Sequence, residues 1–163
     1  MDLNLEIQKK LSSEWFLYLQ NLICEEFEAI EQSVLSNTKK RAGKFKKNIW
    51  NKKKANEGGG QYFILNNGKV FDQVGVNFSR VQGKFSKNFK SKIPGANKSP
   101  YYWASGISVV AHMKNPKIPA IHFNTRFIVT SKEWFGGGMD VTPSHEDFKE
   151  RKILHQSLKK VCE

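Results

Sequence analysis

The chain has 163 residues, of which 39% are hydrophobic, and it carries a formal net charge of +12. This length and apolar content fit one ordinary globular domain with its own core and exclude a chain that is disordered throughout. No apolar run approaches the roughly 20 residues that a membrane helix needs, and the first residues lack the basic and apolar regions of a signal peptide. The expected location is therefore cytoplasmic, and the two cysteines, Cys24 and Cys162, lie far apart and suit a reducing compartment better than a disulfide framework.

The excess of positive charge lies in the middle of the chain. Residues 1–31 hold seven acids and two bases, whereas residues 32–132 hold two acids and twenty bases. Such a segment attracts polyanions, whether nucleic acid, anionic lipid or a small substrate with several carboxylates. A compositional origin is the alternative, because 23 of the 27 bases are lysine and specific anion sites favour arginine.

The first expected element is an amphipathic helix over residues 5–35. Its large apolar residues recur at intervals of three and four, with acids between them; they are Ile7, Leu11, Trp15, Tyr18, Leu22, Ile23, Phe27, Ile30 and Val34. Residues 37–57 follow, with nine bases and no acid before Glu57. This pattern predicts a basic surface loop or a short helix.

Antiparallel strands are expected next, in a sheet over residues 61–129. Residues 61–85 predict a β-meander, because two apolar runs flank the turn dipeptide Asn67-Gly68. Residues 84–100 are polar and rich in glycine and proline, which predicts a loop. A second hairpin over residues 104–129 completes the sheet.

The C-terminal part predicts a glycine-rich turn over residues 136–143 and then a helix over residues 144–162. Thr142 or Ser144 is the expected N-cap of that helix, with Pro143 suited to its first position. We therefore expect a single domain over residues 1–163.

The hairpin over residues 104–129 holds most of the candidate functional groups. Because side chains alternate along a strand, His122, Asn124 and Arg126 share one face, while the apolar residues between them share the other. Ser108 and His112 share a face of the preceding strand. If the register centres on Lys117, His112 lies opposite His122, and Ser108 opposite Arg126.

Four blocks of sequence occur in order along the chain. They are Glu57 to Gly60, Phe71 to Gly83, the hairpin, and Trp134 to Pro143. Together they resemble the oxygen-dependent coproporphyrinogen III oxidases of haem biosynthesis. The resemblance implies an α+β fold, with an antiparallel sheet flanked by helices. It also implies oxidative decarboxylation of two propionates of coproporphyrinogen III to vinyl groups, giving protoporphyrinogen IX, with dioxygen as co-substrate and no organic cofactor.

The resemblance also implies roles for residues of the hairpin and the last block. His122 matches the proton donor of the family, and Ser108, Asn124, Thr125 and Arg126 match its substrate-binding positions. Arg126 is the best carboxylate clamp, because its planar guanidinium can bind a carboxylate through two hydrogen bonds; the alternative is a structural salt bridge. Asp140 suits a base at a pyrrole nitrogen or, alternatively, the cap of the last helix.

A divalent metal such as manganese is a further implication. His112, His122 and His155 match positions that bind metal in some bacterial members of the family, although other members work without one. Two histidines from a hairpin and one from a helix would be a feasible ligand set.

The resemblance ends at Cys162, whereas the family continues with further strands, substrate-binding residues and a dimerisation region. The chain is therefore incomplete relative to the family, and a full-length protein is expected to be a homodimer. Two rival functions follow from these observations. One is an inactive or split-gene remnant of the enzyme. The other is a basic nucleic-acid-binding protein that uses residues 39–54, although no binding motif accompanies that charge.

Overall fold

A computed structural model describes residues 3–34, 41–86, 88, 92–143 and 148–162. Helix α1 spans Leu3–Ser33 and helix α2 spans Phe148–Cys162, with a short 3-10 helix at Ala55–Glu57. The strands are β1 (Lys46–Asn51), β2 (Gly58–Asn66), β3 (Phe71–Lys84), β4 (Tyr101–Met113), β5 (Ala120–Val129) and β6 (Glu133–Thr142). They form one six-stranded sheet in the order β1-β2-β3-β4-β5-β6, and every neighbouring pair is antiparallel. The fold class is α+β, as predicted.

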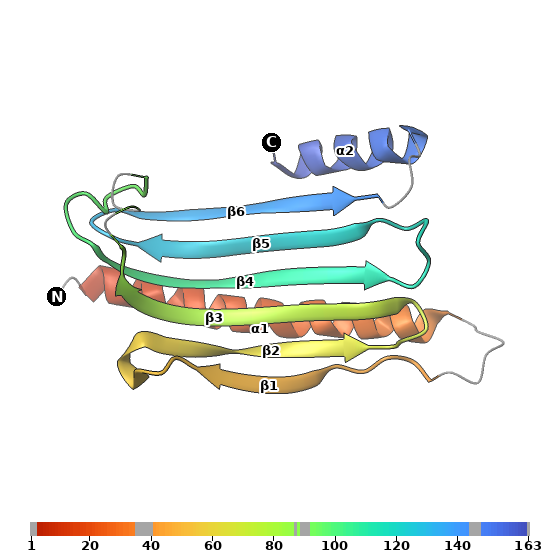
Figure 1. The fold of residues 1–163 in the computed structure, drawn as a ribbon, viewed down its shortest axis with the longest axis horizontal. Coiled ribbons are helices and arrows are strands. Elements are labelled where there is room, and N and C mark those ends of the chain that lie inside the picture. The colour runs from red at the N-terminus through yellow and green to blue at the C-terminus, as the bar shows by residue number, and fades with distance from the viewer. Residues whose placement is uncertain (1–2, 35–40, 87, 89–91, 144–147, 163) are drawn as a thin grey trace.

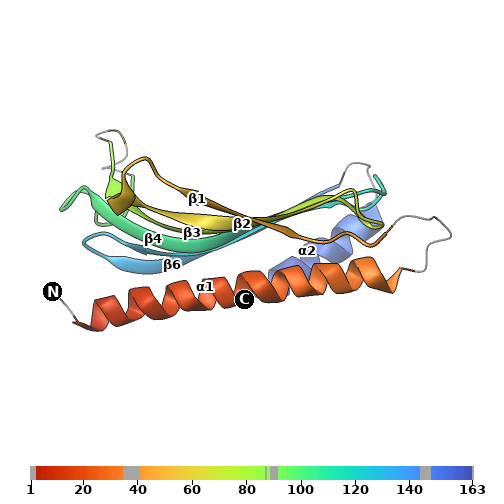
Figure 2. The same cartoon turned by 90° about the horizontal axis from the view of Figure 1, so that it is seen from below.

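The sheet has one covered and one uncovered face (Figure 1). Helix α1 runs along the back of the sheet, behind β3 and β4, and α2 lies beyond the β6 edge. Figure 2 shows that the middle of β4 bows toward α1, so that the opposite face is shallowly concave along the strands. No helix of the described part of the chain is long and apolar enough to cross a membrane.

The core lies between α1 and the covered face. Leu65, Val74 and Val76 are fully buried there against Phe16 of α1, and Val109, Phe127 and Val129 extend the same apolar layer across β4 and β5. Alternate side chains of each strand build this layer, and the residues between them face away from α1. The predicted helix, meander and hairpin are thus confirmed.

The face through which α1 packs is only partly the one predicted, since Ile23 and Phe27 of the predicted stripe pack against the core. Six residues of the predicted apolar stripe are exposed, namely Ile7, Leu11, Trp15, Tyr18, Ile30 and Val34. The buried face instead carries Ser12, Ser13, Phe16, Gln20, Cys24 and Glu31. Polar residues can occupy this face because each has a hydrogen-bond partner, so that burial leaves no polar atom unsatisfied.

Two of these polar side chains attach α1 to the sheet. The Gln20 amide donates to the carbonyl oxygens of Gln61 and Val76. The carboxylate of Glu31, which is fully buried, accepts four backbone N–H groups, those of Gly43, Lys69, Val70 and Phe71. Gly68 is required beside it, since a Cβ there would lie 2.2 Å from Glu31 Oε1.

These hydrogen bonds also set the ionisation of Glu31. Burial alone would raise the pKa of the carboxyl group, but the backbone N–H groups of Gly43, Phe71, Lys69 and Val70 together outweigh it and hold the pKa below its ordinary value. Glu31 is therefore the charged acceptor around which the segments before β1 and β3 fold.

Two segments form strands where irregular structure was predicted. Residues 46–51, inside the predicted basic loop, form the edge strand β1, in which Lys46 and Lys47 are exposed. Charged residues suit an edge strand, because they oppose pairing with other chains. The glycines of the predicted turn over residues 136–143 lie inside β6, which continues to Thr142. Thr142 therefore cannot cap a helix, and Ser144 lies outside the described residues.

Replacing Glu31 with glutamine should destabilise the fold, because the amide nitrogen would face backbone N–H donors. We expect a loss of about 2–4 kcal/mol in the free energy of unfolding at pH 7. Since the folded pKa lies below 4.5, the contribution of Glu31 is full above the ordinary pKa and is lost as pH falls through the lowered folded pKa. Urea unfolding at pH 7 and pH 3 measures both effects.

The matched control is Glu26→Gln, on an exposed position of the same helix. A Glu31→Gln variant as stable at pH 7 as this control would contradict the role given to the buried carboxylate.

Candidate functional site

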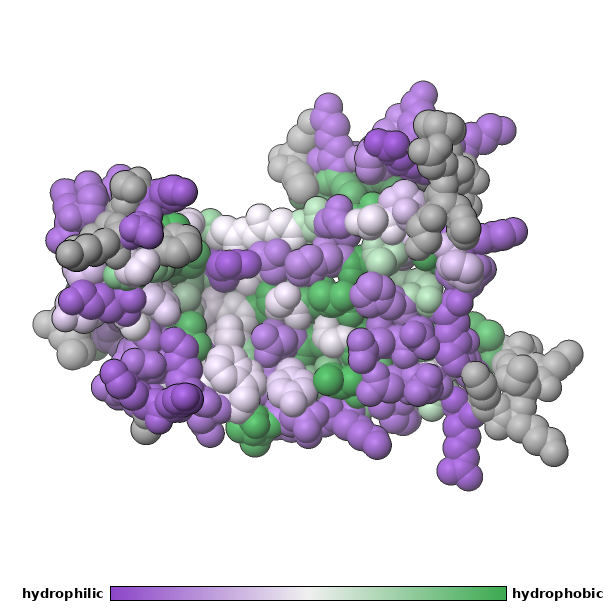
Figure 3. Space-filling view, in the orientation of Figure 1, coloured by the Kyte–Doolittle hydropathy of each residue, from purple (hydrophilic) through white to green (hydrophobic). Residues whose placement is uncertain are grey.

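Most of the predicted site residues lie on the uncovered face of the sheet. Ser108 and His112 of β4, His122, Asn124 and Arg126 of β5, and Asp140 of β6 all belong to the set of alternate residues that points away from α1. Figure 3 shows this face, where pale and green residues gather over the middle of the sheet among purple polar ones. The sheet thus brings these six side chains onto one surface.

The register of the β4–β5 hairpin differs by two residues from the predicted one. His122 lies opposite Val110 rather than His112, and Ser108 lies opposite Asn124 rather than Arg126. The connection is closed by a turn in which Ile118 N–H donates to the Asn115 carbonyl oxygen, and the Asn115 side chain accepts from Lys117 N–H. This turn places the centre of the ladder at residue 116. Because the shift is even, every side chain keeps its predicted face.

The paired residues form three rows that cross all six strands of the uncovered face. The first runs Lys46, Ile64, Gly75, Val110, His122 and Asp140; the second runs Asn48, Tyr62, Asn77, Ser108, Asn124 and Gly138; the third runs Trp50, Gly60, Ser79, Gly106, Arg126 and Gly136. The first and third rows carry only glycine, serine or aliphatic residues over β2–β4 and a charged or titratable residue on β5, whereas the second row is polar from Tyr62 to Asn124. The chemical groups are therefore concentrated on the β5–β6 side of a flat surface.

His122 and Asp140 lie directly opposite each other on β5 and β6. Residues in this relation have Cβ atoms about 4.5–5.5 Å apart, close enough to contact one substrate group. Asp140 accepts a hydrogen bond from the Thr142 hydroxyl, which holds its carboxylate along β6. The position of Asp140 inside a strand excludes the alternative role as the cap of a helix starting at Thr142.

Arg126 is held by its neighbour on the same strand. Its Nη2 donates to Asn124 Oδ1 at 2.6 Å, and the side chain is otherwise exposed to solvent. None of the ion pairs among the described residues involves Arg126. This argues against the structural salt bridge and places a guanidinium without an acidic partner among the described residues one row away from Ser108.

Glycines keep the middle of this surface flat. A Cβ added at Gly75 or Gly138 would meet no atom within 4 Å, so that both positions open onto free space. At Gly106, in contrast, a Cβ would lie 2.7 Å from the Cβ of Arg126. Glycine at this position lets β4 and β5 approach closely and leaves room for the Arg126 side chain to lie near the sheet surface.

Two predicted site residues do not join this surface. Thr125 lies opposite Ile107, which is buried in the core, so the threonine side chain points toward α1. His155 is exposed on α2, beyond the β6 edge (Figure 1). In the described residues, no group of three His, Cys, Asp or Glu side chains could hold a metal ion. The predicted ligands His112, His122 and His155 are therefore not gathered into one group among the described residues.

Sequence reasoning missed the β1–β3 side of the same surface. Trp50, Tyr62 and Asn77 share the rows of Arg126 and Ser108, but β1 was not predicted as a strand. Its sequence of lysine and asparagine around Ile49 and Trp50 has low β-propensity. The only usable signal was the alternation of Asn48 and Trp50 on one face with Lys47 and Ile49 on the other.

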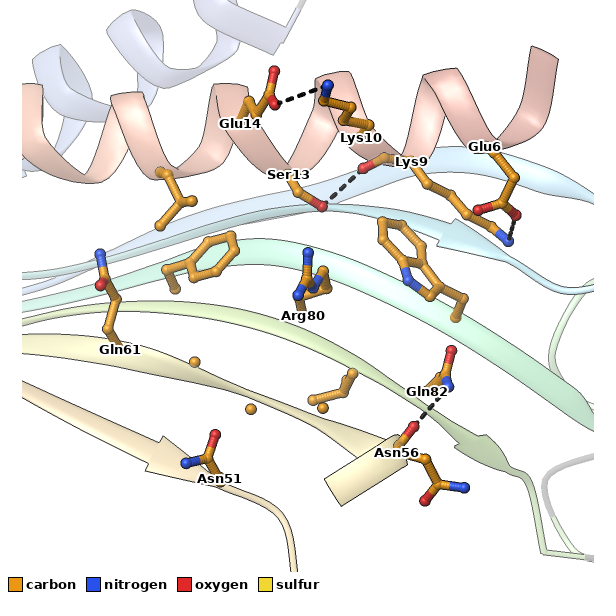
Figure 4. A pocket seen from close by; sticks show the side chains of 17 residues that line it. Glu6, Lys9, Lys10, Ser13, Glu14, Asn51, Asn56, Gln61, Arg80 and Gln82 are labelled. Atoms are coloured by element: carbon orange, nitrogen blue, oxygen red, sulfur yellow. Dashed lines mark hydrogen bonds and ion pairs between the residues drawn. The ribbon is translucent and has the colours of Figure 1, made fainter. Parts of the chain in front are cut away.

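A separate pocket of about 1140 Å³ lies on the covered side, between the N-terminal half of α1 and strands β2 and β3 (Figure 4). Arg80 lies in it between the strands and α1. Lys9 and Lys10 also line it, but they pair with Glu6 and Glu14 on the same helix. The pocket contains none of the predicted site residues, so the chemistry of the chain points to the other face.

Cys24 is not a nucleophile. Burial, followed by the negative charges of Glu28 and Glu25, raises the pKa of its thiol to about 12. The side chain is therefore a neutral thiol in the core at physiological pH.

The observed register predicts where a disulfide can form. In a Cys162→Ser background, Ser108→Cys with Asn124→Cys should oxidise readily, because directly opposite residues have Cα atoms about 4.5–5.5 Å apart. Ser108→Cys with Arg126→Cys, the pair in the rejected register, is diagonal and about 7–8 Å apart. Mass spectrometry after alkylation distinguishes the two. Preferential oxidation of the second pair would contradict the observed register and support the predicted one, which is centred on Lys117.

Comparison with known proteins assigns the family. The family model described as "Coproporphyrinogen III oxidase" matches residues 12–163. The chain is 45% identical over 161 residues to the "Oxygen-dependent coproporphyrinogen-III oxidase" of Rickettsia rickettsii (strain Sheila Smith), covering 99% of this chain and 56% of that protein. It is 46% identical over 155 residues to the protein of the same name from Rickettsia akari (strain Hartford), covering 95% of this chain and 54% of that protein. The chain thus spans about half the length of these relatives, and it belongs to the coproporphyrinogen III oxidase family.

Proposed function

We propose that this chain binds coproporphyrinogen III on the uncovered face of its sheet and contributes catalytic groups of an oxygen-dependent coproporphyrinogen III oxidase. The observation that carries the proposal is the collection of Ser108, His122, Asn124, Arg126 and Asp140 on one face of β4–β6. The names of the relatives support the same substrate and reaction.

The shape and charge of the surface support a tetrapyrrole. Coproporphyrinogen III has an apolar macrocycle and four propionates, so its site needs a broad apolar floor with cations at the rim. Gly75, Val110 and Ile64 provide such a floor beside His122. Arg126 provides the cation, oriented by Asn124. Ser108, directly opposite Asn124, is placed to donate a hydrogen bond to the same carboxylate.

The roles of the residues follow from the balance of the reaction. Each propionate loses carbon dioxide and two electrons as it becomes a vinyl group, and one dioxygen accepts the four electrons from two propionates and is reduced to water. Arg126 and Asn124 hold the reacting carboxylate. Asp140 accepts a hydrogen bond from a pyrrole N–H or removes its proton. Either interaction increases the electron density of the pyrrole ring and makes it a better electron donor. His122, opposite Asp140, supplies a proton to the oxygen that is being reduced.

A divalent ion on His112, His122 and His155 stays a prediction from the family resemblance, and no step is derived through it. A homodimer and a cytoplasmic location likewise stay predictions. The edge strands β1 and β6 are the parts of the described sheet at which another chain could associate through strands.

Removing the guanidinium of Arg126 should weaken tetrapyrrole binding. Because Arg126 is exposed, we expect Arg126→Ala to bind coproporphyrin III, the oxidised and fluorescent form of the substrate, about tenfold more weakly, or about 1.4 kcal/mol. Fluorescence titration of the porphyrin measures the affinity. The matched control is Arg80→Ala, which removes the same charge from the opposite face and should stay within twofold of the parent. Equal losses in the two variants would indicate attraction by net charge alone.

A turnover measurement distinguishes an active oxidase from an inactive remnant of the enzyme. Since the chain spans 56% of the relative from Rickettsia rickettsii, we expect the chain by itself to bind the tetrapyrrole without converting it. Coproporphyrinogen III prepared anaerobically is mixed with the protein in air, and protoporphyrin is followed by chromatography after oxidation. A rate near that of an ordinary enzyme, about 1 per second, would show instead that the residues described above suffice.

The nucleic-acid alternative predicts a different ligand. Binding of random DNA with a steep dependence on salt would support it, whereas the proposal for a tetrapyrrole requires that DNA not displace coproporphyrin III.

A further inference from the structure

Trp50 lies across the uncovered face rather than projecting from it. It belongs to the edge strand β1 and is paired with Gly60 of β2. A Cβ added at Gly60 would come within 3.0 Å of Cε2 and Cζ2 of Trp50. The indole ring therefore covers Gly60, and a larger residue at that position would push the ring away.

A hydrogen bond holds the far edge of the indole. Trp50 Nε1 donates to Asn77 Oδ1 of β3 at 3.4 Å. The side chain thus extends from β1 across β2 to β3, and it is half-buried although it starts on an edge strand. Asn77 lies opposite Ser108, so the edge of the indole is fixed next to the row that contains Ser108 and Asn124.

Trp50 on β1 and Arg126 on β5 belong to the same row of the uncovered face. The row runs Trp50, Gly60, Ser79, Gly106 and Arg126. Strands are spaced by about 4.8 Å, so β3, where the indole ends, and β5, where the guanidinium begins, are about 10 Å apart. Between these two strands the row contains only Gly106 of β4, and Ser79 is its residue on β3. The surface between them is therefore flat, with the indole of Trp50 on one side and the guanidinium of Arg126 on the other.

We propose that Trp50 is a substrate-binding residue whose indole packs against a pyrrole ring of the tetrapyrrole, while Arg126 holds a propionate on the other side. This inference rests on the proposed function and adds to it a contact from β1, which lies three strands from β4. A flat aromatic ring suits a pyrrole, because both present apolar faces and offset contact between rings is favourable. Asn77 is a positioning residue that keeps the indole low over the sheet.

The test compares Trp50→Ala and Trp50→Phe with Trp15→Phe in the same 163-residue chain. Trp15 is exposed on α1, on the other side of the sheet, and serves as the matched control. Coproporphyrin III is the probe. We expect Trp50→Ala to weaken its binding about tenfold, because an aromatic contact and its buried area are lost, whereas Trp15→Phe should stay within twofold of the parent.

A second measurement separates contact from a general effect on stability. Coproporphyrin III is achiral, so circular dichroism in its Soret band, recorded at saturating porphyrin, arises from the groups around it. The indole of Trp50 should dominate that signal. Trp50→Phe, which keeps an aromatic ring and the fold, is expected to lose most of it and only a small part of the affinity.

Three outcomes decide the question. Weaker binding by Trp50→Ala with an altered Soret signal in Trp50→Phe supports the inference. Affinity within twofold in Trp50→Ala together with an unchanged Soret signal overturns it and leaves the proposed function intact. If the parent chain itself does not bind coproporphyrin III, the proposed function fails and the role of Trp50 fails with it. Should Trp50→Ala not fold, the affinity and Soret signal of Trp50→Phe decide in its place.

Discussion

The buried carboxylate of Glu31 is the interaction on which the arrangement of the sheet depends. Near the end of α1, it accepts the backbone N–H groups of Lys69, Val70 and Phe71, where β3 begins, and that of Gly43, just before β1. One side chain thereby fixes the turn between β2 and β3, the approach to β1 and the position of the helix. A buried charge is tolerated because its oxygen atoms are fully used by donors.

The fixed position of α1 determines what the other face can do. With Gln20 and Phe16 also held against the sheet, the buried aliphatic side chains of β2–β5, such as Leu65, Val76 and Val109, point toward the helix. The opposite face then carries the remaining alternate residues, many of them glycine, serine or asparagine, in rows that cross all six strands. Such a face is broad and flat, and it is polar on one side. A flat ligand with charged substituents requires a surface of this form.

The sequence predicted the parts of this structure that follow from alternation. The hairpin, its faces and the grouping of His122, Asn124 and Arg126 depend only on period-2 spacing. The register did not follow, because it depends on the turn at Asn115. Strand β1 was missed because its lysine and asparagine residues obscure the alternation of apolar and polar side chains. Trp50 was therefore missed as well. The polar part of the buried face of α1 was missed because Ser12, Gln20 and Glu31 look like surface residues until their backbone partners are known.

The central claim is that the uncovered face binds the tetrapyrrole, and paramagnetic broadening in NMR spectra tests it most directly. Copper(II) coproporphyrin III is planar and paramagnetic, so it broadens methyl signals near its binding site. The account predicts broadening of Ile64, Val110 and Ile128, which lie on the uncovered face, with sharp signals from Leu17, which lines the pocket beside α1. Broadening of Leu17 with unaffected Val110 would contradict the account and place the ligand in the pocket on the helix side.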